Sequence, residues 1–554
     1  MVKLFKSTLS FLSREESSIF QASSIIMVTV FLSRILGLLR DRLLAARFTP
    51  DELGIYYAAF RIPNMIFELL VMGALATAFI PVFTTILSKK GKDQAFRMAS
   101  SIINIGLIIF ALFSLPIIFF TREISLILAP GFSESEIMKM SSFTKIMVVA
   151  QVFPLILGNF FTGILQSFKN FIIPALAPIV YNVGIIIGII FLTPLIGLYA
   201  PVYGVVIGAV LFTLIQIPLV LNLGYRHFWR VSLKDEGIKE VGKLMLPRTV
   251  GLAVSQIDTT IDLILSSLLG AASVTIFNFA QHLQQVPVGL FGASIAQAAL
   301  PHLSSFYAEE ERQEFRKIFL SSFHQILFLV IPASSILIVL RIPVVRLVFG
   351  ASTLFDWEST VATGKTLAFF SLSLFAQSLV QLLARGFYAL HDTKTPVVVG
   401  VFSVLLNTIL SVILVIFYHQ GVYALGLSTS IASITQMFIL LFYLDRKIGS
   451  FDRYTLIIPT IKILLSGLVT GVALYIPIKL LDQLVFDTTR TINLLLLTGI
   501  ATFAGLSVYL FLSWFLEVPQ MNVVVKMIER ARRLKKGVMI DATGEVVNIQ
   551  ESKI

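Results

Sequence analysis

The segment FLSRILGLLRDRLLAARF (31–48) lies in the first long apolar stretch of the chain and holds Arg34, Arg40 and Asp41. Further runs of about 20 apolar residues, the length of a membrane-spanning helix, follow along nearly the whole sequence. The 554 residues are 56% hydrophobic and only 13% charged, whereas soluble domains are about one quarter charged. Only helices and closed barrels satisfy the backbone in lipid, and these runs are continuous rather than alternating. The sequence therefore predicts an all-α polytopic membrane protein.

The apolar runs predict about fourteen transmembrane helices. They fall at 22–47, 55–88, 97–120, 142–166, 170–193, 198–224, 243–270, 274–304, 315–341, 360–390, 396–417, 420–445, 455–480 and 490–516. With the N-terminus inside, the loops rich in lysine and arginine, which follow the spans ending at 88, 224, 304 and 445, all lie on the inner side. This positive-inside pattern predicts a multi-pass protein with both termini in the cytoplasm.

The two ends of the chain carry separate predictions. Residues 1–21 are expected to form an amphipathic lead-in rather than a cleaved signal, because a small-residue cleavage site is missing. The basic tail 517–554 is expected to lie on anionic lipid headgroups, with a solvated tail as the alternative. The net charge of +12 is placed in loops and tail, so it indicates a membrane surface rather than nucleic acid. The absence of cysteine excludes disulfides and thiolate metal sites.

The charges of the first span suggest a binding cavity. Ionisable groups inside a membrane usually face a bundle interior or a watery space. Arg34 and Asp41 are seven residues apart and share a helix face. Arginine stays charged and its planar fork matches phosphate oxygens, so Arg34 and Arg40 predict a cationic cavity for an anionic headgroup. The alternative is that Arg40 snorkels to the outer interface and pairs with Asp41.

Other polar residues inside predicted spans support such a cavity. Arg61 and Glu68 lie seven apart in the second span and could face the first. His282 lies among glutamines in NFAQHLQQVPVGLFG (278–292). It is either a cavity residue or a hydrogen-bonded interior histidine, and no histidine spacing typical of zinc sites surrounds it.

Two carboxylates and several helix breakers complete the pattern. Asp258 and Asp262 lie one turn apart in the seventh span, where they could help hold a cation with oxygen ligands or cap the helix interior against water. Prolines and glycines interrupt the spans, as at Pro63, Pro178 and Pro287. Such breaks either allow a transporter to bend or are static kinks.

Several motifs together resemble a known family. SRILGLLRD (33–41), AAFRIPN (58–64) and ALATAFIPVF (74–83) are followed in the same order by FIIPALAPIVYN (171–182), VPVGLFGASIAQAALPHLS (286–304) and GFYALHDTKTPV (386–397). The sequence resembles the MurJ (MviN) lipid II flippases of the MOP exporter superfamily over most of its length. Drug-exporting and polysaccharide relatives in that superfamily usually have twelve helices, whereas the resemblance implies fourteen.

The resemblance implies two pseudo-symmetric six-helix lobes, 22–224 and 243–445, joined by a cytoplasmic linker 225–242 around a central cationic cavity. The last two helices, 455–516, would border a groove for the lipid tail. Arg34, Arg40 and Asp41 match the family's cavity residues. The chain departs from the family in two places. An arginine is usual shortly after Pro-Asn in the second span, where this chain has Phe67 and Glu68. Ala-Asp-Arg is usual in the eighth span, where Gln281 and His282 take the last two positions.

The resemblance also implies an ion site. Some family members hold sodium between spans 7, 11 and 12, and the matching positions here are Asp262, Asn407, Ser411 and Thr429. An aspartate is more usual at Ser411, which argues against a strong sodium site.

The function that the resemblance implies is a flippase in the bacterial inner membrane that serves peptidoglycan biosynthesis, cell wall biogenesis and cell shape. It would move undecaprenyl-diphosphate-linked lipid II from the inner to the outer leaflet by alternating access, as a monomer driven by the membrane potential. It would not be an enzyme, and no Walker motif is present for direct use of ATP. The alternatives are another MOP exporter, for undecaprenyl-linked polysaccharides or for drugs, and a non-transporting membrane scaffold.

Overall fold

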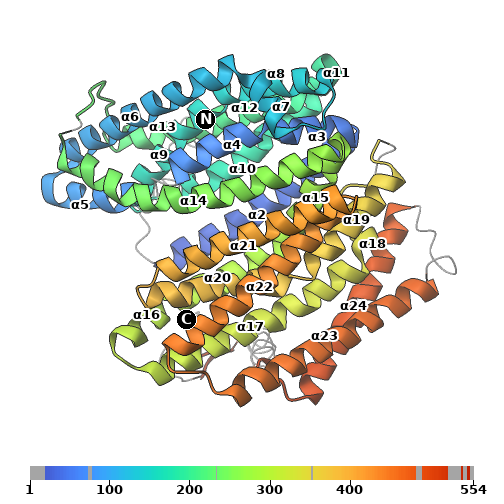
Figure 1. Cartoon of the computed structure of the whole chain (residues 1–554). Helices are drawn as coiled ribbons and strands as arrows, with labels where there is room; N and C mark the ends of the chain where they lie inside the picture. Colours follow the sequence, from blue (N-terminus) through green and yellow to red (C-terminus); the bar gives the residue numbers. More distant parts are fainter. Residues whose placement is uncertain are drawn as a thin grey trace. The chain divides into compact units, whose positions relative to one another are not determined.

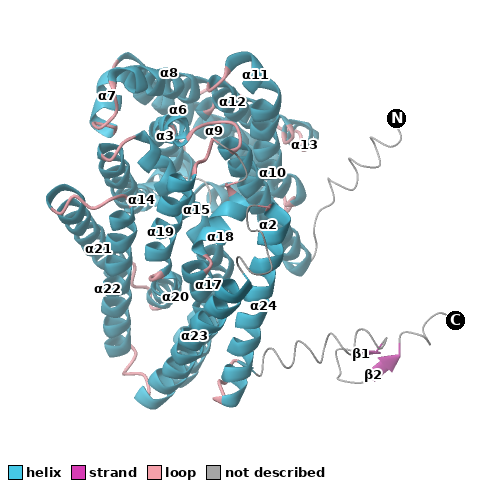
Figure 2. Ribbon diagram, turned by 90° about the vertical axis from the view of Figure 1, so that its right-hand side faces the viewer, coloured by secondary structure: helices cyan, strands magenta, loops and turns pink. Residues whose placement is uncertain are grey.

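A computed structural model of the chain describes residues 19–72, 78–232, 234–350, 354–481, 490–521, 538–540 and 546–548. Helices make up nearly all of it (Figure 1). Two three-residue strands, β1 (Val538–Ile540) and β2 (Val546–Asn548), pair antiparallel near the C-terminus (Figure 2). The predicted amphipathic lead-in 1–21 lies almost wholly outside the described residues, as does the basic stretch 529–536 of the predicted tail.

The first half of the chain contains helices up to the seventh predicted span. They are α2 (Ile19–Ala45), α3 (Pro50–Ala59), α4 (Arg61–Phe67), η1 (Glu68–Met72), α5 (Ile80–Lys90), α6 (Lys92–Phe119), α7 (Thr121–Leu128), α8 (Glu134–Ala150), α9 (Val152–Ser167), α10 (Ile172–Ile187), η3 (Gly188–Leu192), α11 (Thr193–Ile196), α12 (Tyr199–Leu214), α13 (Ile217–Asn222) and α14 (Glu236–Leu268). Elements labelled η are short π-helical stretches.

The second half contains the remaining predicted spans. Its helices are α15 (Ala271–Pro287), η4 (Val288–Ala293), α16 (Ser294–Ala308), α17 (Arg312–Val339), α18 (Arg341–Val348), α19 (Trp357–Ser371), α20 (Leu374–Ala389), α21 (Lys394–Val412), η5 (Ile413–Phe417), α22 (Tyr423–Lys447), α23 (Arg453–Leu481) and α24 (Thr491–Phe515).

Most predicted spans appear as long apolar helices. Within the described residues, 10 helices are long and apolar enough to cross a membrane, and the pair α19 and α20, bent by 44°, makes an eleventh. The other three predicted spans correspond to α2, to the broken series α3 to α5, and to α14. Each of these three carries ionisable residues at positions predicted to lie in the membrane. The all-α polytopic fold is confirmed, and the count is consistent with about fourteen spans.

The described chain falls into two compact units. Unit 1 comprises residues 1–283, 344–367 and 401–429, and unit 2 comprises 284–343, 368–400 and 430–554. Helices of the second predicted lobe, 243–445, contribute to both units. The boundaries of the units therefore differ from those of the predicted lobes, and the division into lobes stays a prediction.

Unit 2 has an apolar core around α17. Buried side chains of α16, α17, α20 and the second half of α22 form this core, with Phe319, Phe387 and Leu440 fully enclosed. α23 and α24 lie side by side, and both contact α17 (Figure 2). The Tyr509 hydroxyl donates a hydrogen bond to the Phe328 carbonyl at 2.7 Å, which ties α24 to α17.

Short π-helical stretches interrupt several of the predicted membrane spans. The π-helical stretch η4 directly follows Pro287, one of the predicted breakers, and contains Gly289 and Gly292. Three more π-helical stretches, η1, η3 and η5, lie in the second, fifth and eleventh predicted spans. Because a π-helical stretch interrupts the regular hydrogen-bond ladder, these spans are not uniform α-helices.

The loop motif containing His391 and Asp392 anchors the start of α21 in unit 2. Asp392 accepts backbone hydrogen bonds from Lys394 and Thr395 at 3.1 and 3.0 Å, and a bond from Nζ of Lys447 at 2.6 Å. Its slight burial would raise the pKa, but the bonds from Lys447 and Thr395 outweigh this and lower the pKa of Asp392 to about 2. The carboxylate therefore stays ionised at neutral pH and links the α20–α21 loop to the end of α22.

Within unit 1, α10 and α12 pack through glycines. A Cβ atom added at Gly184 would lie 2.4 Å from the Cα atom of Gly208, and one at Gly188 would lie 2.3 Å from the Cα atom of Gly204. The absence of side chains lets the two backbones touch, as in other membrane helix pairs. Since α10 also packs against α2, this contact supports the charged part of the first span.

We expect Gly184→Val to separate α10 from α12 and to lower the melting temperature of the purified protein. Overpacking costs about 1–3 kcal/mol and more where backbones must move, as they must here. Gly499→Val in α24 is the matched control, because a Cβ atom there would meet nothing within 4 Å. Equal melting temperatures for the two variants, measured in detergent, would contradict the close packing of α10 and α12.

Candidate functional site

A cavity of about 300 Å³ lies in unit 1. Side chains from α2, α3, α4, α10, α14 and α15 line it, together with Phe60 between α3 and α4. The lining residues are Arg40, Tyr56, Tyr57, Phe60, Arg61, Asn64, Tyr181, Thr259, Leu263, Ser266, Phe277, Asn278, Gln281 and His282. The cavity is thus surrounded by two guanidinium groups, an imidazole, amides and phenols.

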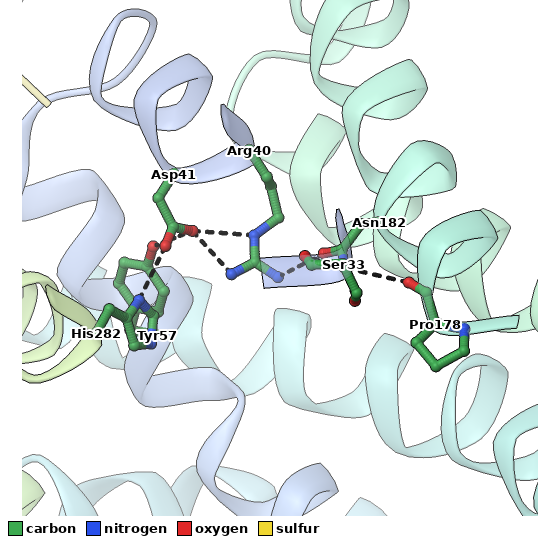
Figure 3. Close-up of polar contacts among 7 residues, drawn as sticks. All are labelled: Ser33, Arg40, Asp41, Tyr57, Pro178, Asn182 and His282. Atoms are coloured by element: carbon green, nitrogen blue, oxygen red, sulfur yellow. Dashed lines mark hydrogen bonds and ion pairs between the residues drawn. The ribbon is translucent and has the colours of Figure 1, made fainter. Parts of the chain in front are cut away.

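Arg40 and Asp41 form an ion pair at this cavity. Nε and Nη2 of Arg40 donate to one carboxylate oxygen of Asp41 at 2.9 and 2.8 Å (Figure 3). Asp41 is only 2% exposed, whereas Arg40 keeps part of its side chain accessible at the cavity wall. The ion pair named in the alternative interpretation of Arg40 is therefore present, while the guanidinium also borders the cavity.

His282 and Tyr57 also contact the Asp41 carboxylate. Nδ1 of His282 lies 2.9 Å from the second carboxylate oxygen, and the Tyr57 hydroxyl donates to the first at 3.4 Å (Figure 3). The rings of Tyr57 and His282 meet edge to face, with centroids 6.1 Å apart. α2, α3 and α15 thus converge on one buried carboxylate, which fixes the positions of Arg40 and His282.

Asn182 of α10 positions the other side of Arg40. Its amide oxygen accepts a bond from Nη1 of Arg40 at 3.3 Å, and its amide nitrogen donates to the Ser33 hydroxyl at 3.2 Å and the Pro178 carbonyl at 3.1 Å (Figure 3). Asn182 was not among the residues predicted from the sequence. Its position one turn after Pro178 in an otherwise apolar helix is the signal that could have identified it.

Arg61 is held by α14. Its Nε donates to the Thr260 hydroxyl at 2.9 Å, and Nη2 donates to the side-chain oxygen of Gln256 at 2.8 Å and to the Gln256 carbonyl. From their spacing, Arg61 and Glu68 could face the first span, but the hydrogen bonds of Arg61 go to the seventh. Glu68 is half-buried at the start of η1.

Arg34 differs from Arg40 in its surroundings. It is exposed, does not line the cavity, and makes no hydrogen bond or ion pair within the described part of the chain. Asp41 forms its ion pair with its neighbour Arg40, and within the described residues Arg34 is not bonded to Asp41. A role of Arg34 in cargo binding stays a prediction.

The carboxylates of the seventh span lie near the predicted ion-binding residues. Asp258 accepts a hydrogen bond from the Asn407 amide at 3.0 Å, and the Thr429 hydroxyl donates to the Asn407 oxygen at 3.4 Å. One carboxylate oxygen of Asp262 is buried without a hydrogen-bond partner. The Ser411 hydroxyl is 2.5 Å from that of Ser428 instead.

This donor set fits a small hard cation only in part. An unpartnered carboxylate oxygen with amide and hydroxyl oxygens nearby is the chemistry that such a cation requires. Ser411 contributes no charge and is bonded elsewhere. Among the residues that the structure describes, no three His, Cys, Asp or Glu side chains gather as a metal-binding group.

Comparisons with known proteins give matches over most of the chain. The family model described as lipid II flippase MurJ matches residues 44–495. A protein of Buchnera aphidicola named probable lipid II flippase MurJ is 28% identical over 509 residues, which cover 90% of this chain and 98% of that protein.

Two solved structures show the same fold. One described as lipid II flippase MurJ in an inward closed conformation has a TM-score of 0.74 and 26% identity, and the match covers 90% of this chain and 99% of the other. An inward-facing multidrug resistance transporter of the MATE family, in the MOP superfamily, has a TM-score of 0.65 at 16% identity, with 76% and 98% covered. The second likeness shows a shared fold alone.

Proposed function

The chain belongs to the lipid II flippase MurJ family, and we propose that it moves lipid II from the inner to the outer leaflet of the bacterial cytoplasmic membrane. The observation that carries the proposal is the cavity between α2, α3, α4, α10, α14 and α15, which places Arg40 and Arg61 inside an apolar helical bundle. Charged groups at membrane depth are costly, so their convergence on one cavity indicates a ligand of opposite charge.

The cavity chemistry suits a diphosphate attached to a sugar. A guanidinium presents paired N–H groups that match phosphate oxygens, and the bond from Arg40 to the Asn182 amide oxygen can be exchanged for one to phosphate. The asparagine, glutamine and tyrosine side chains around it offer donors and acceptors to hydroxyl and amide groups. We assign cargo binding to Arg40, Arg61 and His282, which line the cavity. Asp41 is included because it positions Arg40 and His282.

Arg34 and Glu68 are included among the cargo-binding residues on the sequence motifs alone. Arg34 is exposed and Glu68 is half-buried, and neither lines the cavity. The role proposed for Arg34 is to attract the anionic headgroup rather than to hold it. The Glu68 carboxylate only accepts hydrogen bonds, so its proposed partners are hydroxyl and amide groups of the cargo rather than the diphosphate.

Alternating access exposes the cavity first to one leaflet and then to the other. The π-helical stretches in the second, fifth, eighth and eleventh spans supply places where these helices can bend. No covalent bond is made or broken, so the chain acts as a transporter rather than an enzyme. We place it in the inner membrane as a monomer, with both termini cytoplasmic, surrounded by membrane lipids and without a nucleic-acid partner.

The membrane potential is the proposed driving force. An anion that leaves a negative interior gains about 2.3 kcal/mol per charge per 100 mV. If sodium contributes, Asp262, Asn407 and Thr429 would hold it, whereas Ser411 is bonded to Ser428. A sodium ion there would supply a positive charge that compensates the buried carboxylates.

The test is replacement of the lipid II flippase in a bacterium depleted of its own. We expect this chain to restore growth and cell shape, and the purified protein in vesicles to expose lipid II to an outside probe. Failure to rescue, combined with movement of another undecaprenyl-linked glycan in the same vesicles, would assign the chain to a different cargo.

A further inference from the structure

His282 has one ring nitrogen engaged and one free. Its Nδ1 lies 2.9 Å from Asp41, which is almost fully buried and also accepts two bonds from Arg40. An ionised carboxylate only accepts hydrogen bonds, so Nδ1 of His282 carries a proton and donates it. Nε2 makes no hydrogen bond within the described part of the chain, although the side chain lines the cavity and is 32% exposed.

The protonation state of the ring decides what Nε2 offers to a ligand. A neutral imidazole that donates through Nδ1 presents a lone pair at Nε2, which repels a phosphate oxygen because both are acceptors. A protonated imidazole presents an N–H group and a positive charge at the same place. One proton therefore converts His282 from a group that opposes a diphosphate into one that binds it.

The charges around His282 make this proton significant. The charged and titratable groups around it are Arg40 and Asp41 of α2, Tyr56 and Tyr57 of α3, Arg61 of α4 and Tyr181 of α10. Asp262 of α14 interacts electrostatically with Arg61. The tyrosines are neutral near pH 7, and Asp41 offsets the charge of Arg40. Within the described part of the chain, the Arg61 guanidinium bonds to Thr260 and Gln256 rather than to a carboxylate. Protonation of His282 thus adds a second positive charge to the cavity, in addition to that of Arg61.

We propose that His282 takes up a proton as the diphosphate of the cargo enters the cavity, so that affinity for the cargo falls as the pH rises. The proposal rests on the proposed function, which supplies the diphosphate. An arginine, which is usual in the eighth span of the family, would stay charged and give no such dependence.

The experiment measures lipid II binding to the full chain in detergent micelles on both sides of neutral pH, from about pH 5.5 to about pH 8.5. The diphosphate of lipid II is esterified at both ends, so it does not titrate there. On the alkaline side, we expect the Kd of the wild type to rise by up to about tenfold per pH unit, the limit for one linked proton. Calorimetry in two buffers of different ionisation enthalpy should show proton uptake on binding.

Three variants separate His282 from other groups. His282→Arg should bind with a Kd that is independent of pH and without proton uptake. His282→Asn keeps a donor for Asp41 but lacks the second ring nitrogen, so it should bind weakly at every pH. The exposed His302 of α16 provides the matched control, and His302→Asn should keep the wild-type profile.

The outcomes distinguish this inference from the proposed function. A flat pH profile in the wild type, or equal proton uptake by His282→Arg, overturns the role of His282 while leaving lipid II as the cargo. If lipid II does not bind at any pH, the proposed cargo is wrong, and an undecaprenyl-diphosphate-linked sugar without the peptide takes its place in the titration. Absence of binding by that lipid as well would overturn the inference.

Discussion

Arg40→Ala is expected to abolish rescue of a strain depleted of its lipid II flippase. The variant loses three donated hydrogen bonds, two to Asp41 and one to Asn182, and the cavity loses one of its two guanidinium groups. A charge-assisted hydrogen bond contributes about 1.5–3 kcal/mol, so cargo binding should weaken by at least tenfold. Arg40→Lys should rescue poorly, because an ammonium group cannot make the two parallel N–H···O hydrogen bonds that a planar guanidinium makes to a phosphate.

The controls for Arg40 separate binding from folding. Removing one partner of a buried ion pair costs about 3–5 kcal/mol, so protein abundance and melting temperature must be measured beside rescue. The double variant Arg40→Ala, Asp41→Asn removes both charges and should fold better than Arg40→Ala while still failing to rescue. Arg122, in an exposed ion pair with Glu134, gives the matched control, and Arg122→Ala should rescue fully.

Arg34→Ala provides a second comparison. Because Arg34 is exposed and unpaired within the described chain, its loss should leave the melting temperature unchanged. Any loss of rescue would then reflect weaker interaction with the cargo.

Full rescue by Arg40→Ala at normal protein abundance would contradict the proposal that the cavity binds the cargo.

Lipid II exposure in vesicles is expected to accelerate strongly under a membrane potential and little under a sodium gradient. A cargo with two negative charges gains about 4.6 kcal/mol per 100 mV, which corresponds to more than a thousandfold bias between leaflets. Sodium coupling should be weak because Ser411 supplies a hydroxyl, already bonded to Ser428, where a carboxylate would bind the ion more strongly.

The measurement uses two opposite conditions with the same vesicles. A potassium–valinomycin potential without sodium should speed the exposure of lipid II to an outside probe. A sodium gradient with the potential clamped near zero should have little effect, and Asp262→Asn should change neither result by much. If only the sodium gradient works, the buried carboxylate oxygen of Asp262 acts with a ligand other than Ser411, and the proposal of potential-driven transport fails.

The sequence by itself determined the features that depend on local composition. Long apolar runs can satisfy their backbones in lipid only as helices, so the polytopic all-α fold followed from composition and run length. The pairing of Arg40 with Asp41 was part of an alternative that the sequence left open, since adjacent residues on a helix do not ordinarily face each other. Charges inside apolar spans identified α2, α4 and α14 as elements of interest because such charges are costly unless they are used.

Only the tertiary structure decided which distant groups meet these charges. Asn182 contacts Arg40 across 142 residues of sequence, and His282 contacts Asp41 across 241. The partner of Arg61 proved to be α14 rather than the first span. Lipid tails are as apolar as the side chains of the helices, so hydrophobicity does not specify which helices become neighbours. That choice depends on shape, as in the glycine contact between α10 and α12, and on polar groups that find partners only after the helices pack.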